Sequence, residues 1–186
     1  KLVEELVPGK LSLGVVTRTL QNLLQESVPI RDMRTVVEAL TEVSGRTQDP
    51  DQLAQLVRPK LGRMIVQGLL ENRDTLSVMT LDPHLEQLLH NVLQQNNGSP
   101  GMVLEPSLAE SLFAALRESA RNTEEQGFAA VLVVSPAIRP WMSKAVRFRV
   151  SDLTVLSYSE IPDDQPVKVI HTVQADPRNN PTVNKA

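Results

Sequence analysis

The sequence contains no cysteine among its 186 residues. This absence excludes disulfide bonds, thiolate zinc sites and cysteine nucleophiles, and it suits a reducing compartment. Aromatic residues make up only 3% of the chain, so the core must be aliphatic and the base-stacking surfaces that bind single-stranded nucleic acid are nearly excluded. Lys and Arg number 19 against 22 Asp and Glu, which leaves a formal charge of -3. That is the wrong sign for a domain that neutralises duplex phosphates.

The chain also lacks a long apolar run and an N-terminal leader. Its most apolar stretch, residues 128–134, ends at Ser135 and Pro136 and is far shorter than the roughly 18 apolar residues that a membrane-spanning helix needs. The residues from Lys1 onward contain neither the basic segment nor the apolar core of a signal peptide. We therefore expect a soluble piece of a longer protein, with a tail over residues 175–186 that is disordered or foreign to the native chain.

The hydrophobic pattern divides the chain into two parts. Up to about residue 73, apolar residues recur at helical spacing in three stretches. These stretches begin after Ser12, Pro29 and Asp49. Gly45 is expected to cap the second helix and Pro59 to interrupt the third. Three amphipathic helices cannot bury their apolar faces singly, so residues 1–73 are predicted to form a helical subdomain that resembles a winged helix.

Residues 74–174 alternate between strand and helix patterns. Strands are predicted over 76–81, 128–134, 153–158 and 167–173, and helices over 83–95, 106–127 and 136–148. Asp82 and Ser135 are expected to cap helices with their side chains, residues 96–101 to form a loop, and residues 161–166 to form a turn. The predicted fold class is therefore α+β or α/β: a helical subdomain followed by a small sheet with helices packed on it.

No pattern for catalysis or metal binding is found in the sequence. The eight glycines form neither a dinucleotide-binding fingerprint nor a P-loop, and no G-x-S-x-G elbow occurs. His84 and His90 lie about 240° apart around a helix, so they cannot bind one metal from the same face. The acidic pairs are adjacent residues, which point in different directions on a helix. We expect no enzyme activity, no cofactor and no metal site.

Two kinds of function remain open from the residues alone. One is DNA binding, in which residues 30–43 would be a recognition helix that presents Arg31 and Arg34; acidic residues on the same helix would face the phosphates unfavourably. The other is protein recognition by clusters of basic residues, including those around Trp141. The candidate contact residues are Arg31, Asp32, Arg34, Arg58 and Arg63.

Several segments, in the same order along the chain, resemble the cytosolic domain of the bacterial type III secretion export gate. They are Val3–Lys10, residues 20–40 with Ile30-Arg31-Asp32-Met33-Arg34, Leu81–Glu86, Arg139-Pro140-Trp141 and Val155–Pro162. The resemblance runs to about Val173 and is closer to the injectisome branch than to the flagellar paralogue. Ser159 departs from the family pattern, which has Asn at this place.

This resemblance implies a role in protein export. In the family, membrane-spanning helices precede a cytosolic part, so the chain would be the last two cytosolic subdomains, at the cytoplasmic face of the inner membrane. It would touch the membrane only through the absent N-terminal part. The family's cytosolic parts form a homo-nonameric ring that receives chaperone–substrate complexes, gatekeepers and other export proteins, and no nucleic acid. The alternative is a winged-helix DNA-binding regulator with a small α/β sensing domain.

Overall fold

The computed structural model describes residues 2–95 and 104–175, which fall into two compact units. The first unit contains residues up to Glu71 together with Ser159–Asp164, and the second contains Asn72–Tyr158 and the chain from Gln165 onward. The predicted loop at 96–101 and the predicted tail beyond Ala175 lie outside the described residues.

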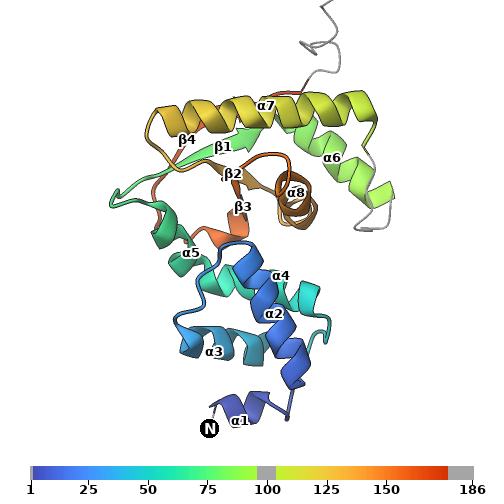
Figure 1. Ribbon diagram of the computed structural model, residues 1–186, viewed down its shortest axis with the longest axis vertical. Helices are drawn as coiled ribbons and strands as arrows, with labels where there is room; N and C mark the ends of the chain where they lie inside the picture. The colour runs from blue at the N-terminus through green and yellow to red at the C-terminus, as the bar shows by residue number, and fades with distance from the viewer. Residues whose placement is uncertain (1, 96–103, 176–186) are drawn as a thin grey trace, which may run out of the picture. The chain divides into compact units, whose positions relative to one another are not determined.

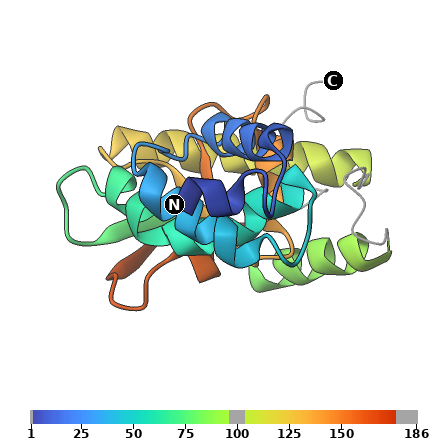
Figure 2. The same ribbon diagram turned by 90° about the horizontal axis from the view of Figure 1, so that it is seen from below.

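The first unit is built of helices, which can be followed in Figure 1 and from below in Figure 2. They are α1 (Leu2–Leu6), α2 (Leu13–Gln25), α3 (Met33–Val43), α4 (Pro50–Val57), the 3-10 helix η1 (Arg58–Leu61) and α5 (Gly62–Leu69). The side chains of Ser12 and Asp49 accept hydrogen bonds from free backbone N–H groups at the starts of α2 and α4. Pro59 has no N–H, and the chain tightens into η1 there, as its position predicts. Gly45 does not cap α3, because Ser44 is the C-cap residue.

The apolar core of the helical unit is built without aromatic residues. Leu23, Leu40, Leu53 and Val57 are 0% exposed, and α2 packs on α4 while α3 packs on α1 and α4. All three Phe, the Trp and the Tyr of the chain lie in the other unit. Burying each Leu or Val side chain contributes about 1.5–3 kcal/mol, so a dozen such residues can hold a small helical unit together without aromatics.

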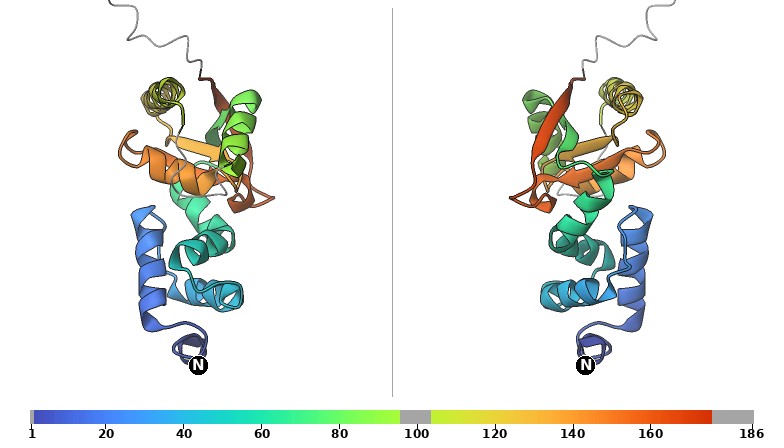
Figure 3. Two further views of the ribbon diagram at one scale, coloured as in Figure 1. Left: turned by 90° about the vertical axis from the view of Figure 1, so that its right-hand side faces the viewer. Right: turned by 90° about the vertical axis from the view of Figure 1, so that its left-hand side faces the viewer.

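The second unit is a parallel sheet of four strands with helices packed on it (Figures 1 and 3). The strands are β1 (Leu76–Leu81), β2 (Val131–Val134), β3 (Thr154–Ser157) and β4 (Val167–Val173), in the spatial order β3-β2-β1-β4. The helices are α6 (Pro83–Gln95), α7 (Pro106–Glu125) and α8 (Arg139–Val146), and a short 3-10 helix, η2 (Tyr158–Glu160), follows β3. Parallel strands need crossover connections: α6 and α7 lie between β1 and β2, α8 lies between β2 and β3, and η2 with the residues up to Pro166 lies between β3 and β4. The predicted fold class is confirmed.

The two strand ends predicted to carry helix caps behave differently. The carboxylate of Asp82 accepts hydrogen bonds from the N–H groups of His84 at 3.0 Å and Leu85 at 3.3 Å, so it caps α6 as predicted. Ser135 does not cap α8, because that helix begins only at Arg139. The Oγ of Ser135 is buried and finds no hydrogen-bond partner among the described residues. Its backbone N–H instead donates to Glu86 Oε1 at 2.8 Å.

The segment between β3 and β4 is the other departure from the sequence prediction. The sequence predicts a turn over 161–166 inside the sheet subdomain. In the structure, residues 159–164 belong to the helical unit, although both flanking strands belong to the sheet. The contacts that hold this segment are made by residues about 100 positions away, which local sequence patterns do not report.

Candidate interaction surface

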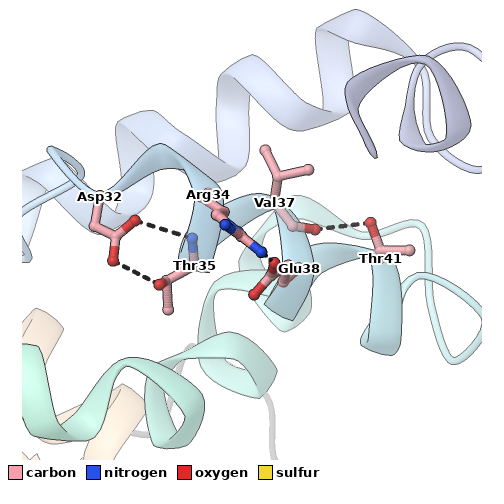
Figure 4. A network of polar contacts seen from close by, with 6 residues as sticks. All are labelled: Asp32, Arg34, Thr35, Val37, Glu38 and Thr41. Carbon is pink, nitrogen blue, oxygen red and sulfur yellow. Dashed lines mark hydrogen bonds and ion pairs between the residues drawn. The ribbon is translucent and has the colours of Figure 1, made fainter. Parts of the chain in front are cut away.

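Asp32 is the side chain that starts α3. Its Oδ1 accepts a hydrogen bond from the N–H of Thr35 at 3.1 Å, and its Oδ2 accepts one from the Thr35 hydroxyl at 2.6 Å (Figure 4). These hydrogen bonds stabilise the carboxylate and hold the pKa of Asp32 below its ordinary value. The predicted contact residue Asp32 is therefore engaged as a helix cap, although it remains exposed.

Arg34 lies one turn from Glu38 on the outer side of α3. Its Nε donates to Glu38 Oε1 at 2.9 Å, and the two side chains are 81% and 47% exposed (Figure 4). The hydrogen bond that Arg34 donates to the Glu38 carboxylate raises the pKa of Arg34. An exposed pair of this kind contributes little to stability and leaves both groups accessible. Arg31, Asp32 and Arg34 thus form one exposed, mixed-charge corner at the start of α3.

An exposed apolar face lies on α2. Leu13, Leu20 and Leu24 fall within about 40° of one another around the helix axis; Leu13 is 69% exposed, Leu24 is 51% exposed and Leu20 is half-buried. Val16 and Leu23, which α2 supplies to the core, lie about 60–80° from Leu13 around the same axis. We call Leu13, Leu20 and Leu24 the outer face of α2. Aliphatic side chains gathered on one exposed side of a helix are typical of a protein contact surface.

The helical spacing in the stretch after Ser12 includes Leu24 together with the core residues Val16 and Leu23, although Leu24 is exposed. A helix that packs on one side only needs apolar residues along one stripe. On α2 the exposed and the buried leucines share one arc of about 100° with Val16. The helical spacing therefore carries no signal that would have identified the outer face from the sequence.

Arg58 is not a surface contact, in contrast to its prediction. Its side chain is 1% exposed, its Nη1 pairs with Glu26 Oε2 at 2.7 Å, and its Nε donates to Glu160 Oε1. Glu160 is 1% exposed as well. A buried charge is tolerated when it is paired and hydrogen-bonded. Arg58 is therefore an internal ionic link of the helical unit, and its partners explain why a charged side chain is inside.

Arg63 keeps the exposure that its prediction requires. Its Nη2 lies 3.0 and 3.2 Å from the two carboxylate oxygens of Asp164, and the two side chains are 71% and 67% exposed. The structure places Arg63 at the start of α5, whereas Arg31, Asp32 and Arg34 lie at the start of α3. Contact of these four residues with a partner stays a prediction.

A second exposed feature follows α8 in the sheet unit. Phe148 is 90% exposed and stands between Arg147 and Arg149, whose guanidinium lies 4.8 Å from the centre of the Phe113 ring. Residues 139–149 contain four basic residues and no acidic one, but Arg139 is buried and donates to the Val155 carbonyl. We call residues 147–149 the basic turn. Arginine and aromatic side chains are enriched in protein interfaces.

Within the described residues, no group of three or more His, Asp or Glu side chains could hold a metal ion. In the same part of the chain, no helix is both long and apolar enough to cross a bilayer. The candidate functional sites are the exposed features of α2, α3 and the basic turn.

Comparison with known proteins assigns the chain to a family. Residues 1–166 match the model of the FHIPEP family. The chain belongs to the FHIPEP family. The flagellar biosynthesis protein FlhA of Escherichia coli K12 is 41% identical over 173 residues, which are 93% of this chain and 24% of that protein. FlhA of Bacillus subtilis 168 is 30% identical over 172 residues, which cover 92% of this chain and 25% of that protein. This FHIPEP chain thus spans about a quarter of these relatives.

Solved structures share the fold of this FHIPEP chain. The CdsV protein of Chlamydia pneumoniae matches with a TM-score of 0.82 and 25% identity, over 94% of this chain and 50% of that one. A chain in the complex of CdsV and CdsO matches with a TM-score of 0.81 and 26% identity, over 93% and 50% of the two chains. The nonameric SctV-C of EPEC matches with a TM-score of 0.78 and 28% identity, over 92% and 51%.

Proposed function

We propose that this FHIPEP chain is part of the cytosolic portion of a type III export gate, at the cytoplasmic face of the bacterial inner membrane. The observation that carries the proposal is the match over nearly the whole chain, in sequence to FlhA and in fold to the nonameric SctV-C. In this role the chain acts as an assembly and docking module without catalysis of its own. Its partners are copies of itself and other export proteins, including chaperone–substrate complexes and gatekeepers.

The export family has an injectisome branch and a flagellar branch. The assignment of this chain to the injectisome branch stays a prediction. FlhA of E. coli is 41% identical to the chain, whereas CdsV and SctV-C are 25% and 28% identical. The higher identity to FlhA favours the flagellar branch. The test is to exchange this chain for the matching segment of a gate protein of each branch. The chain should restore swimming when it replaces the matching segment of E. coli FlhA. Restoration only in an injectisome gate protein would instead support the injectisome branch, and failure in both would contradict the export role.

Self-assembly is proposed to use the helical unit, through the outer face of α2 and the corner at Arg31 and Arg34. The exposed leucines of α2 and the exposed cations at the start of α3 are the kinds of side chains that form the apolar centre and the polar rim of an interface. The chain alone is expected to be monomeric or weakly associating at micromolar concentration, because it spans only half of the matched SctV-C chain.

The experiment on assembly uses the complete cytosolic portion and sedimentation velocity. The double variant Arg31→Glu and Arg34→Glu should shift the protein from rings toward monomers. The matched control is Arg117→Glu with Arg121→Glu, two exposed residues of α7 whose reversal changes the net charge by the same amount. Unchanged assembly in the first variant would remove this corner from the interface.

DNA binding is the alternative function, and the structure offers it little support. The carboxylate of Glu38 stands exposed beside Arg34 on α3 and would repel the phosphates that the helix would have to approach. The chain should show no salt-sensitive retention on random duplex DNA in a gel-shift experiment.

A further inference from the structure

Residues 159–164 join two strands of the sheet unit but belong to the helical unit. The chain therefore passes between the units at three places: after Glu71, after Tyr158 and after Asp164. If residues 159–164 leave the helices, only the passage after Glu71 still connects the two units. We call residues 159–164 the strap.

The strap is held by polar contacts and not by apolar burial. Glu160 is the one strap residue with a buried side chain, Ile161 and Pro162 are half-buried, and the other three strap residues are exposed. Release of a segment that gave leucines to the core would also lose the free energy of their burial. The strap depends instead on the pairing of Glu160 with Arg58, a residue that also binds Glu26.

Gly62 provides a second, independent sign of how closely the strap lies on the helices. A Cβ atom built at Gly62 would collide with the carbonyl oxygen of Glu160. Since this oxygen is part of the backbone, no side-chain rotation can relieve the collision. Gly62 stands at the first position of α5, where alanine would be the better helix former. Its presence is explained by the approach of the strap.

We propose that the strap is a detachable element and that Arg58 is its lock. While Arg58 pairs with Glu160, the strap stays on the helical unit and the chain joins the two units at three places. When the pair opens, Glu160 regains water, the strap leaves, and the helices and the sheet each remain folded. Release leaves a single passage of the chain between the units, after Glu71. This device goes beyond the proposed export role and does not depend on it.

The experiment measures thiol accessibility, for which a chain without cysteine is ideal. Ile161→Cys places a single thiol on the strap, and in a separate protein Val36→Cys places one in the core of the helical unit, where Val36 is 0% exposed. Each reporter is combined with Arg58→Met, with Gly62→Ala, and with Arg63→Met. Arg63→Met is the matched control, because it removes an exposed ion pair to the same strap.

Gly62→Ala is the decisive variant. It changes no charge and favours the helix, so it displaces the strap without weakening α5. In Arg58→Met the strap loses its buried ion pair, and in Gly62→Ala the added methyl group collides with the strap backbone. In both variants the thiol at position 161 should react with Ellman's reagent at least about tenfold faster than in the parent. The thiol at position 36 should stay protected in Gly62→Ala, and Arg63→Met should change neither rate by more than about twofold.

Two results would overturn the proposal. The first is an unchanged reaction rate at position 161 in Gly62→Ala, which would mean that the strap does not leave. The second is a parallel rise at positions 36 and 161 in Gly62→Ala, which would mean that the strap and the helices unfold as one cooperative unit.

Discussion

Leu23 and Leu24 are neighbours in α2, yet Leu23 is 0% exposed and Leu24 is 51% exposed. Successive residues of a helix point about 100° apart, and here the boundary between core and surface passes between them. Leu23 therefore belongs to the core of the helical unit, whereas Leu24 stays accessible on its surface.

We predict opposite consequences for these two leucines. Leu23→Ala should lower the free energy of unfolding by about 2–5 kcal/mol, because it leaves a cavity in the core. Leu24→Ala should change it by less than about 0.5 kcal/mol and should weaken self-association of the complete cytosolic portion. Urea unfolding and sedimentation velocity measure the two quantities. Assembly that withstands both Leu24→Ala and Leu13→Ala would exclude the outer face of α2 from the interface.

Asp82 and Ser135 give a second matched pair of predictions. Asp82→Ala removes the side-chain acceptor at the start of α6 and should cost about 1 kcal/mol of stability. Ser135→Ala removes a buried hydroxyl that lacks a partner among the described residues, so it should be neutral or slightly stabilising. Thermal unfolding followed by circular dichroism tests both. A loss of stability in Ser135→Ala comparable to that of Asp82→Ala would show that the hydroxyl has a bonding role.

These residues also show what the sequence could and could not predict. Asp82 and Asp49 were predictable as caps, because a cap acts within three residues and a proline follows each of them. Arg58 was not predictable as a buried residue, since its partner Glu160 lies 102 residues away. Ser135 resembles a cap in sequence, but α8 begins four residues later. A helix cap can be predicted from a single sequence because it involves neighbouring residues. The burial of a side chain cannot, because it depends on segments that meet only in the fold.

Stability should depend on pH through Asp32. Hydrogen bonds from Thr35 lower the pKa of Asp32 in the folded state, so the folded protein binds this proton more weakly than the unfolded chain does. The stabilisation is complete above the unfolded pKa of about 4 and is lost as the pH falls through the folded pKa. Wild type should therefore be more stable than Asp32→Asn at pH 7, and the difference should shrink in acid.

The measurement for Asp32 is urea unfolding from pH 7 to pH 3. Thr35→Val is the companion variant, because it removes the hydroxyl that binds the Asp32 carboxylate and keeps the shape of the side chain. It should reduce the pH dependence in the same direction as Asp32→Asn. A difference between wild type and Asp32→Asn that stays constant over this range would show that Asp32 titrates alike in the folded and unfolded states.

Phe148 is the residue that can separate docking from assembly. Its ring is 90% exposed, so Phe148→Ser removes an apolar side chain that contributes almost nothing to the core and should leave thermal stability unchanged. If the basic turn receives export partners, this variant of the full-length protein should form normal rings and yet secrete less substrate. Leu24→Asp, in contrast, places a charge on the outer face of α2 and should reduce ring formation and secretion together.

Phe113→Ala is the control for folding, because Phe113 is buried beneath Arg149 and its loss should cost about 3–5 kcal/mol. Normal secretion by Phe148→Ser would place the docking surface elsewhere, because an accessible aromatic residue at the centre of a contact contributes a large share of the binding energy.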